Sequence, residues 1–123
     1  MRRGIQLGAI IMGLSVMLGA FGAHALKDHL TAHMLQNWQT GVHYQMIHGI
    51  AILLAALLMG RVESKWLGRA ISVFAFGVLF FSGSLYVLAL SGILWLGAIT
   101  PIGGVLFILG WLYLVLAART IQK

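Results

Sequence analysis

The sequence contains no cysteine, a single proline (Pro101) and only two carboxylates, Asp28 and Glu63. The lack of cysteine excludes thiol catalysis, disulfide exchange and cysteine-ligated metals. The formal net charge is +6, but the lysines and arginines form no cluster on a soluble face. Binding to a nucleic acid is therefore not expected.

Apolar residues dominate the chain: 61% of its 123 residues are hydrophobic and only 8% are charged. A soluble domain of this size could not hide so much apolar surface, because small folds keep a large surface fraction. The apolar runs are continuous and do not alternate, which favours helices over a β-barrel. We predict a single domain, 1–123, that folds as an all-α integral membrane bundle of four transmembrane helices.

Four uncharged runs are long enough to cross the hydrocarbon core of a bilayer as helices. They cover about 5–23, 41–60, 70–90 and 101–118. The first run is longer than the core of a signal peptide, about 7–15 residues, and is interpreted as a span. Thr100 is predicted to cap the fourth span, with Pro101 at its first helical position.

The connection before the second span allows two interpretations. A short amphipathic helix at the membrane interface would explain the apolar residues that recur every fourth position, Leu26, Leu30, Met34 and Trp38. Alternatively, Thr31 caps a helix that runs straight into the second span, and we prefer this version.

Small residues predict where helices approach one another. The first span carries a seam with steps of four and three, formed by Gly8, Met12, Ser15, Gly19 and Gly22. In the third span, Ser82 and Tyr86 share one face, and Ser84 lies on the nearly opposite face. The third span is therefore predicted to contact two neighbours.

The distribution of lysine and arginine predicts the orientation. Seven of the eight lie in the terminal segments or the second connection, namely Arg2, Arg3, Arg61, Lys65, Arg69, Arg119 and Lys123. The first and third connections hold only Lys27, so both termini are predicted to be cytoplasmic. On this topology Asp28 and Glu63 lie on opposite sides of the membrane, which excludes paired-carboxylate chemistry.

Seven polar side chains then fall in or near the outer half of the membrane. These candidate ligand-binding residues are His24, Gln45, His48, Ser82, Ser84, Tyr86 and Thr100. Polar groups in hydrocarbon are costly unless they are partnered. One interpretation is that they hold the helices together by hydrogen bonds. The other is a small outward-opening pocket for a lipid headgroup, a hydrophobic small molecule or an ion.

No metal site or cofactor is predicted. His29 and His33 are four residues apart, which suits Zn²⁺ on a helix, but no glutamate follows His29. Haem ligation by His24 and His48 has no further support in the sequence. The stretch Phe81-Ser82-Gly83-Ser84 is not a nucleophile elbow, so no enzymatic activity is expected.

Several stretches resemble the small four-span bacterial membrane proteins of the YgdD/YwdK type, a family of unknown function with a vertebrate counterpart. The matching stretches are Gly19–His24, Trp38 with Thr40-Gly41, Tyr44-Gln45 with His48, Leu79–Tyr86, Thr100–Gly104 and Gly110-Trp111. Together they cover nearly the whole chain. The resemblance implies a multi-pass protein of the bacterial cell (inner) membrane and implies no activity.

Three functions follow as expectations. The first is a non-enzymatic protein that binds a lipid or a small hydrophobic ligand at the outer-leaflet polar pocket. The second is an accessory or assembly protein whose glycine-rich faces, around Gly19 and Gly110, dock on another copy or another membrane protein. The third is an oligomeric transporter of small molecules or ions, since four spans without internal charge would conduct only as an oligomer.

Overall fold

The computed structural model describes residues 1–121. Within this range it contains four long helices: α1 (Arg2–His24), α2 (Ala32–Met59), α3 (Lys65–Ser91) and α4 (Thr100–Ala118). A 3₁₀ helix, η1 (Leu94–Ala98), precedes α4. All four helical segments, with η1 included in the last, are long and apolar enough to cross a membrane. The predicted all-α, four-span architecture is confirmed.

Two helices, α2 and α3, begin well before the expected spans, and each is capped by a side chain. Thr31 Oγ1 accepts a hydrogen bond from the Met34 amide at 3.2 Å, so α2 begins directly after Thr31 and continues into the span. The continuous helix is therefore confirmed, and a separate amphipathic helix is not. At the other end of the bundle, Ser64 caps α3 in the same way.

The start of α4 differs from the prediction. Thr100 is the first helical residue and Ile99 occupies the cap position, while Pro101 lies in the first turn as expected. The Thr100 hydroxyl lies 2.6 Å from Ser84 Oγ on α3 and does not cap its own helix. A contact between two helices has thus replaced the local capping interaction.

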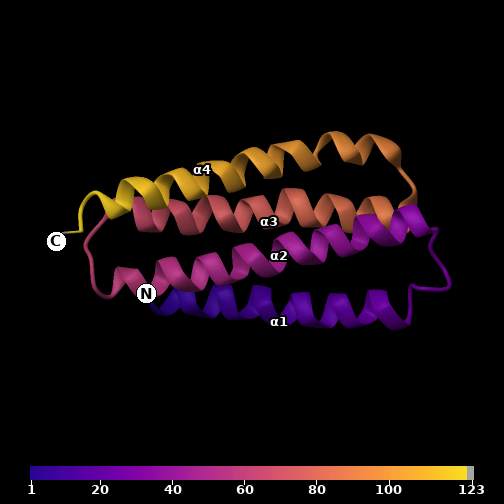
Figure 1. Cartoon of the computed structure of the whole chain (residues 1–123), viewed down its shortest axis with the longest axis horizontal. Coiled ribbons are helices and arrows are strands. Elements are labelled where there is room, and N and C mark those ends of the chain that lie inside the picture. Colours follow the sequence, from indigo (N-terminus) through magenta and orange to yellow (C-terminus); the bar gives the residue numbers. More distant parts are fainter. Residues whose placement is uncertain (122–123) are drawn as a thin grey trace.

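The four helices run antiparallel to their neighbours and lie in sequence order across the molecule, as Figure 1 shows. Each packs mainly on the helices that precede and follow it in the chain, and α1 and α4 form the two edges. Within residues 1–121 no extended interface joins α1 to α4. The bundle is therefore flattened, with the outer faces of both edge helices turned towards lipid.

Glycines allow the helices to approach closely. A Cβ atom at Gly22 on α1 would lie 2.6 Å from the Trp38 ring, and one at Gly103 on α4 would lie 2.6 Å from Phe81 Cβ. The predicted seam of small residues on α1 therefore packs on α2. Ser82 of α3 faces α2, whereas Ser84 faces α4, as its two-sided pattern predicted.

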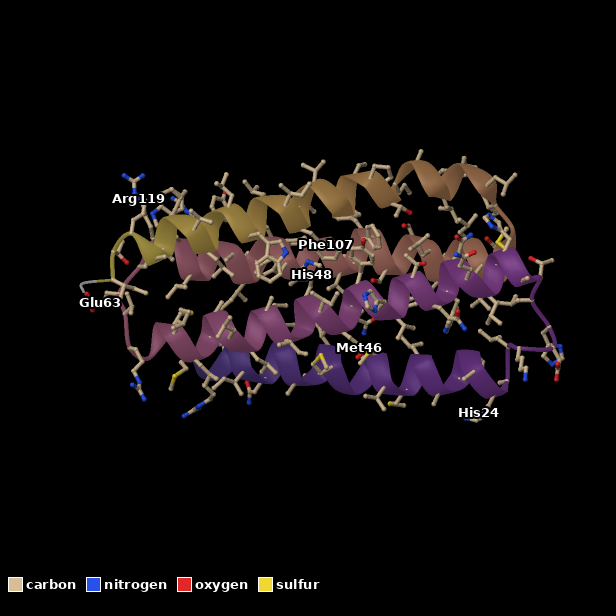
Figure 2. The ribbon with its side chains drawn as sticks, viewed as in Figure 1. His24, Met46, His48, Glu63, Phe107 and Arg119 are labelled. Carbon is tan, nitrogen blue, oxygen red and sulfur yellow. The ribbon has the colours of Figure 1, made fainter. Side chains whose placement is uncertain are left out.

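Both ends of the described chain lie at the same end of the bundle (Figure 1). Glu63 and Arg119 also lie there, and His24 lies at the opposite end (Figure 2). The basic residues of the termini and of the second connection therefore lie together at this end of the bundle. Lys123 lies outside the described residues. That this end faces the cytoplasm stays a prediction from the charge distribution.

Candidate functional site

Gln45 joins three helices through both ends of its amide. Its Nε2 donates to the Ile11 carbonyl of α1 at 2.9 Å, and its Oε1 accepts from the Tyr86 hydroxyl of α3 at 2.6 Å. The side chain is almost completely buried on α2. A glutamine in this position is stable because each polar atom has a partner.

The two serines of α3 are bonded on opposite sides of their helix. Ser82 Oγ donates to the Gly41 carbonyl of α2 at 2.6 Å. Ser84 Oγ contacts the Phe81 carbonyl of its own helix at 2.9 Å and Thr100 Oγ1 of α4 at 2.6 Å. Because Ser84 has one hydroxyl proton and a carbonyl only accepts, Thr100 is the donor between the two hydroxyls.

His48 is held by both ring nitrogens. Its Nδ1 lies 2.7 Å from the Tyr44 carbonyl, and its Nε2 lies 3.1 Å from Nε1 of Trp111 on α4. A carbonyl only accepts and an indole N–H only donates, so His48 carries its proton on Nδ1 and is neutral. Neither nitrogen is left for a metal or haem iron while these two bonds persist.

Aromatic rings surround the His48 imidazole. Its ring stacks on Phe107 of α4, with centroids 3.5 Å apart and planes inclined by 6°. Phe74 of α3 approaches from another side with centroids 5.5 Å apart. His48 of α2 therefore contacts both α3 and α4, and only 3% of its surface is exposed.

The predicted site residues do not form one pocket. Gln45, Tyr86 and Ser82 act between α1, α2 and α3, whereas Ser84 bonds Thr100 near the start of α4. His24 is exposed at the carboxyl end of α1, far from His48 in Figure 2. The structure does not bring His24 together with the other candidate residues, because it lies exposed at the end of α1.

His48 is close to the middle of α2. It lies about 24 Å along α2 from Ala32 and about 17 Å from Met59, at 1.5 Å per residue, and its partner Trp111 lies beyond the midpoint of α4. Figure 2 accordingly shows His48 near the middle of the bundle. That His48 falls in or near the outer half of the membrane stays a prediction.

Polar interior groups are satisfied throughout residues 1–121. No buried side-chain nitrogen or oxygen in this range lacks a hydrogen-bond partner. Gln45, Ser82, Ser84 and His48 therefore act first as bonds between helices, which is one of the two interpretations that the sequence left open. A ligand that took a ring nitrogen of His48, or the hydroxyl proton of Ser82 or Ser84, would have to break an existing hydrogen bond.

A cleft of about 550 Å³ lies beside His48, between α2 and α4, and we refer to it as the α2–α4 cleft. Its walls are mainly apolar and aromatic, and they include Tyr44, His48, Phe81, Gly104, Phe107 and Trp111. The apolar residues at its mouth, Val105 and Ile108, are 64% and 71% exposed. The cleft therefore opens on the lipid-facing side of the bundle.

Sequence reasoning missed the residues that shape this cleft. Trp111 was not among the candidate site residues, yet it donates to His48 and is 41% exposed at the cleft. Tyr44 was not a candidate either, and its ring centroid lies 4.5 Å from that of Phe81. The resemblance motifs Tyr44-Gln45 and Gly110-Trp111 contained both residues and were the only signal for them.

The four apolar helices and their hydrogen-bonded interior define a multi-span helical membrane protein. Residues 18–104 match the family described as "Protein of unknown function (DUF423)". The chain is 49% identical over 115 residues to a UPF0382 membrane protein of Staphylococcus epidermidis, which covers 92% of each chain. It is 45% identical over 121 residues to the UPF0382 membrane protein YwdK of Bacillus subtilis, covering 93% of this chain and 94% of YwdK.

The chain therefore belongs to this family of membrane proteins of unknown function, which confirms the resemblance to the YwdK type. A further relative, SAB0533 of Staphylococcus aureus, is 48% identical over 92% of both chains. No solved structure matches the chain.

Proposed function

We propose that this protein binds a lipid, with one acyl chain in the α2–α4 cleft, and that it does so without catalysing a reaction. We place it in the bacterial cell (inner) membrane with both termini in the cytoplasm. The observation that carries the proposal is the cleft itself. Its volume of about 550 Å³ lies within the range of ligand pockets, and its mouth opens where lipid chains are the surrounding solvent.

The shape of the cleft suits a chain that lies along α4. Its lining extends from Pro101 to Trp111, about 15 Å at 1.5 Å per residue, and the His48–Trp111 pair closes the inner end. The outer end lies close to η1, where Trp95 is 67% exposed and suits the headgroup region. A lipid headgroup near η1 would place its chain in the cleft.

The proposal that the protein is not an enzyme is supported by the state of its polar groups. His48 uses both ring nitrogens, and the hydroxyls of Ser82 and Ser84 are bonded between helices. Asp28 and Glu63, the two carboxylates, belong to connections at opposite ends of the bundle. No pair of these groups is arranged as a nucleophile and its base.

Docking through glycine-rich faces is less well supported. A Cβ atom at Gly19 would lie 3.3 Å from Val42 of α2, and Gly110 faces the ring of Phe74 on α3. These two glycines therefore serve packing inside the bundle. We retain a homo-oligomer or a membrane-protein partner only as alternatives that use other surfaces.

The test fills the α2–α4 cleft without disturbing the fold. A Cβ atom at Gly104 would meet only Phe81 Cδ2, at 3.9 Å, so Gly104→Leu places its side chain in the cleft. Gly13→Leu is the matched control, because Gly13 is exposed on α1 and a Cβ there has nothing within 4 Å. Both changes add the same side chain to a lipid-facing helix.

The probe is phosphatidylcholine with a photoactivatable diazirine in one acyl chain, reconstituted with the purified protein. We expect crosslinks concentrated on Tyr44, Val105, Ile108 and Trp111, lost in Gly104→Leu and retained in Gly13→Leu. Crosslinks spread evenly over the exposed faces of α1 and α4, or unchanged by Gly104→Leu, would show that the cleft holds no preferred lipid.

A further inference from the structure

We propose a second lipid site, independent of the α2–α4 cleft, where the ends of α1, α2 and α3 meet: a groove that takes the phosphate of an anionic phospholipid. The groove has a volume of about 460 Å³ and is lined by Arg2, Arg3, Gly4, Met59, Gly68 and Ile71. It combines two arginines with an apolar floor. We refer to it as the basic groove.

The first turn of α1 concentrates positive charge in the place where a helix least tolerates it. Arg2 and Arg3 are its first two residues, the turn holds no acidic residue, and Met1 at the cap position provides no side-chain acceptor. The first amides of a helix lack partners within the helix and carry the positive end of its dipole. An anion at this end would accept from these amides and neutralise both arginines.

The surrounding charges do not supply that anion. Arg61, Lys65, Arg69 and Arg119 lie at the same end, and among residues 1–121 Glu63 is the one carboxylate there. The whole end is therefore strongly positive. In a membrane protein such a surface attracts anionic lipids, and basic pockets between helices bind their headgroups.

The other basic residues of α3 face a different direction. Lys65 Nζ and the Arg69 guanidinium lie 5.1 and 4.9 Å from the Trp66 ring centroid, and Trp66 packs on Tyr113 of α4. These cations thus lie on the α4 side of α3, away from α1. The basic groove is consequently a local feature of Arg2 and Arg3.

The apolar floor selects a lipid over a free phosphate ion. Met59 and Ile71 line the groove, and a Cβ atom at Gly68 would have nothing within 4 Å. Arg2 and Arg3 line the same groove, so an acyl chain attached to a bound phosphate has apolar surface to cover. Arginine suits the phosphate because its planar fork donates two hydrogen bonds at once.

The test measures the phospholipid retained by the purified full chain in detergent, by native mass spectrometry, so that the result does not depend on membrane orientation. The probes are phosphatidylglycerol and phosphatidylcholine, added in equal amounts. We expect the unmodified protein to retain phosphatidylglycerol preferentially. The combined change Arg2→Gln and Arg3→Gln should lower that retention at least about tenfold, because each charge-assisted contact contributes strongly.

Two matched controls separate a site from general charge attraction. The combined change Lys65→Gln and Arg69→Gln also removes two positive charges, but from the α4 side, and it should leave phosphatidylglycerol retention within about twofold of the unmodified protein. Gly68→Leu fills the groove without changing charge and should abolish retention, whereas Gly83→Leu, on an equally open part of α3, should not. Circular dichroism confirms that each variant is helical.

Three results would overturn the proposal. Equal loss in the variant with Lys65→Gln and Arg69→Gln would show attraction by net charge alone, and full retention in Gly68→Leu would show that the groove is not occupied. Displacement of phosphatidylglycerol by millimolar inorganic phosphate would show that the acyl chains contribute nothing. None of these outcomes bears on the α2–α4 cleft, because the two sites share no lining residue and the test of the cleft follows crosslinks from a zwitterionic lipid.

Discussion

Two adjacent glycines on α4 should respond to the same substitution in opposite directions. In Gly103→Ala the new Cβ would lie 2.6 Å from Phe81 Cβ and still closer to the Phe81 backbone nitrogen. Real Cβ atoms essentially never approach other atoms within 3.0 Å, and the new Cβ would lie 2.3 Å from the Phe81 nitrogen, so the two helices must separate by at least about 0.7 Å. The obstacle is largely backbone, which cannot rotate out of the way.

The magnitude follows from two opposing effects. Overpacking of a close interface costs about 1–3 kcal/mol, and a backbone obstacle places Gly103→Ala near the upper value. Replacing glycine by alanine inside a helix gains about 1 kcal/mol. We therefore expect Gly103→Ala to lower the free energy of unfolding by about 2 kcal/mol.

Gly104→Ala is the control within the same helical turn. Its Cβ would meet Phe81 Cδ2 at 3.9 Å, an ordinary van der Waals contact. Only the helix-propensity effect remains, so the free energy of unfolding of this variant should rise by about 0.5–1 kcal/mol. The two alanine variants should then differ by about 3 kcal/mol although they add the same methyl group to neighbouring residues.

The assay is reversible unfolding by dodecyl sulfate in mixed micelles, followed by far-ultraviolet circular dichroism, with all three proteins at one concentration. Equal stability of the two alanine variants would refute the reasoning, because it would mean that α3 and α4 are not in close contact at Gly103. Increased stability of both variants would also mean that α3 and α4 are not in close contact at Gly103.

The remaining predictions concern the Gln45 hydrogen bonds and the orientation. Gln45→Leu should lower stability by about 1 kcal/mol, since hydrogen bonds between membrane helices contribute about 0.6 kcal/mol each, and a double-mutant cycle with Tyr86→Phe should give a coupling near that single-bond value. Zero coupling would show that the Tyr86–Gln45 bond is absent. Because the chain has no cysteine, His29→Cys and Glu63→Cys each create one thiol. An impermeant maleimide should label the first in intact cells and the second only after permeabilisation, and the reverse pattern would invert the topology.

Composition and periodicity predicted the features that each helix has on its own, namely its approximate extent and the side on which each residue lies. The four spans followed from uncharged runs, and the opposite directions of Ser82 and Ser84 followed from their separation of two residues, about 200° around a helix. The seam on α1 likewise follows from residue spacing alone, because small residues on one face allow another helix to approach.

Partners and depths could not be predicted because they depend on how separate helices are placed. Gln45 bonds the carbonyl of Ile11, and a backbone acceptor leaves no mark in the sequence. Gln45 and His48 are three residues apart and lie on similar sides of α2, yet one faces α1 and α3 while the other reaches α4. The flattened arrangement of the bundle determines which helices these two side chains contact, and the identity of the residues does not.

The state of Gly104 connects the packing of the bundle to its proposed role. Its neighbour Gly103 is required for contact with α3, but Gly104 has room for a larger side chain that would cover apolar surface and favour the helix. A protein selected only for stability would fill the α2–α4 cleft at this position. The polar groups of the interior already bond one another within residues 1–121, so the recognition proposed for this cleft depends on its shape. An acyl chain in the cleft would supply the apolar contacts that Gly104 leaves unmade.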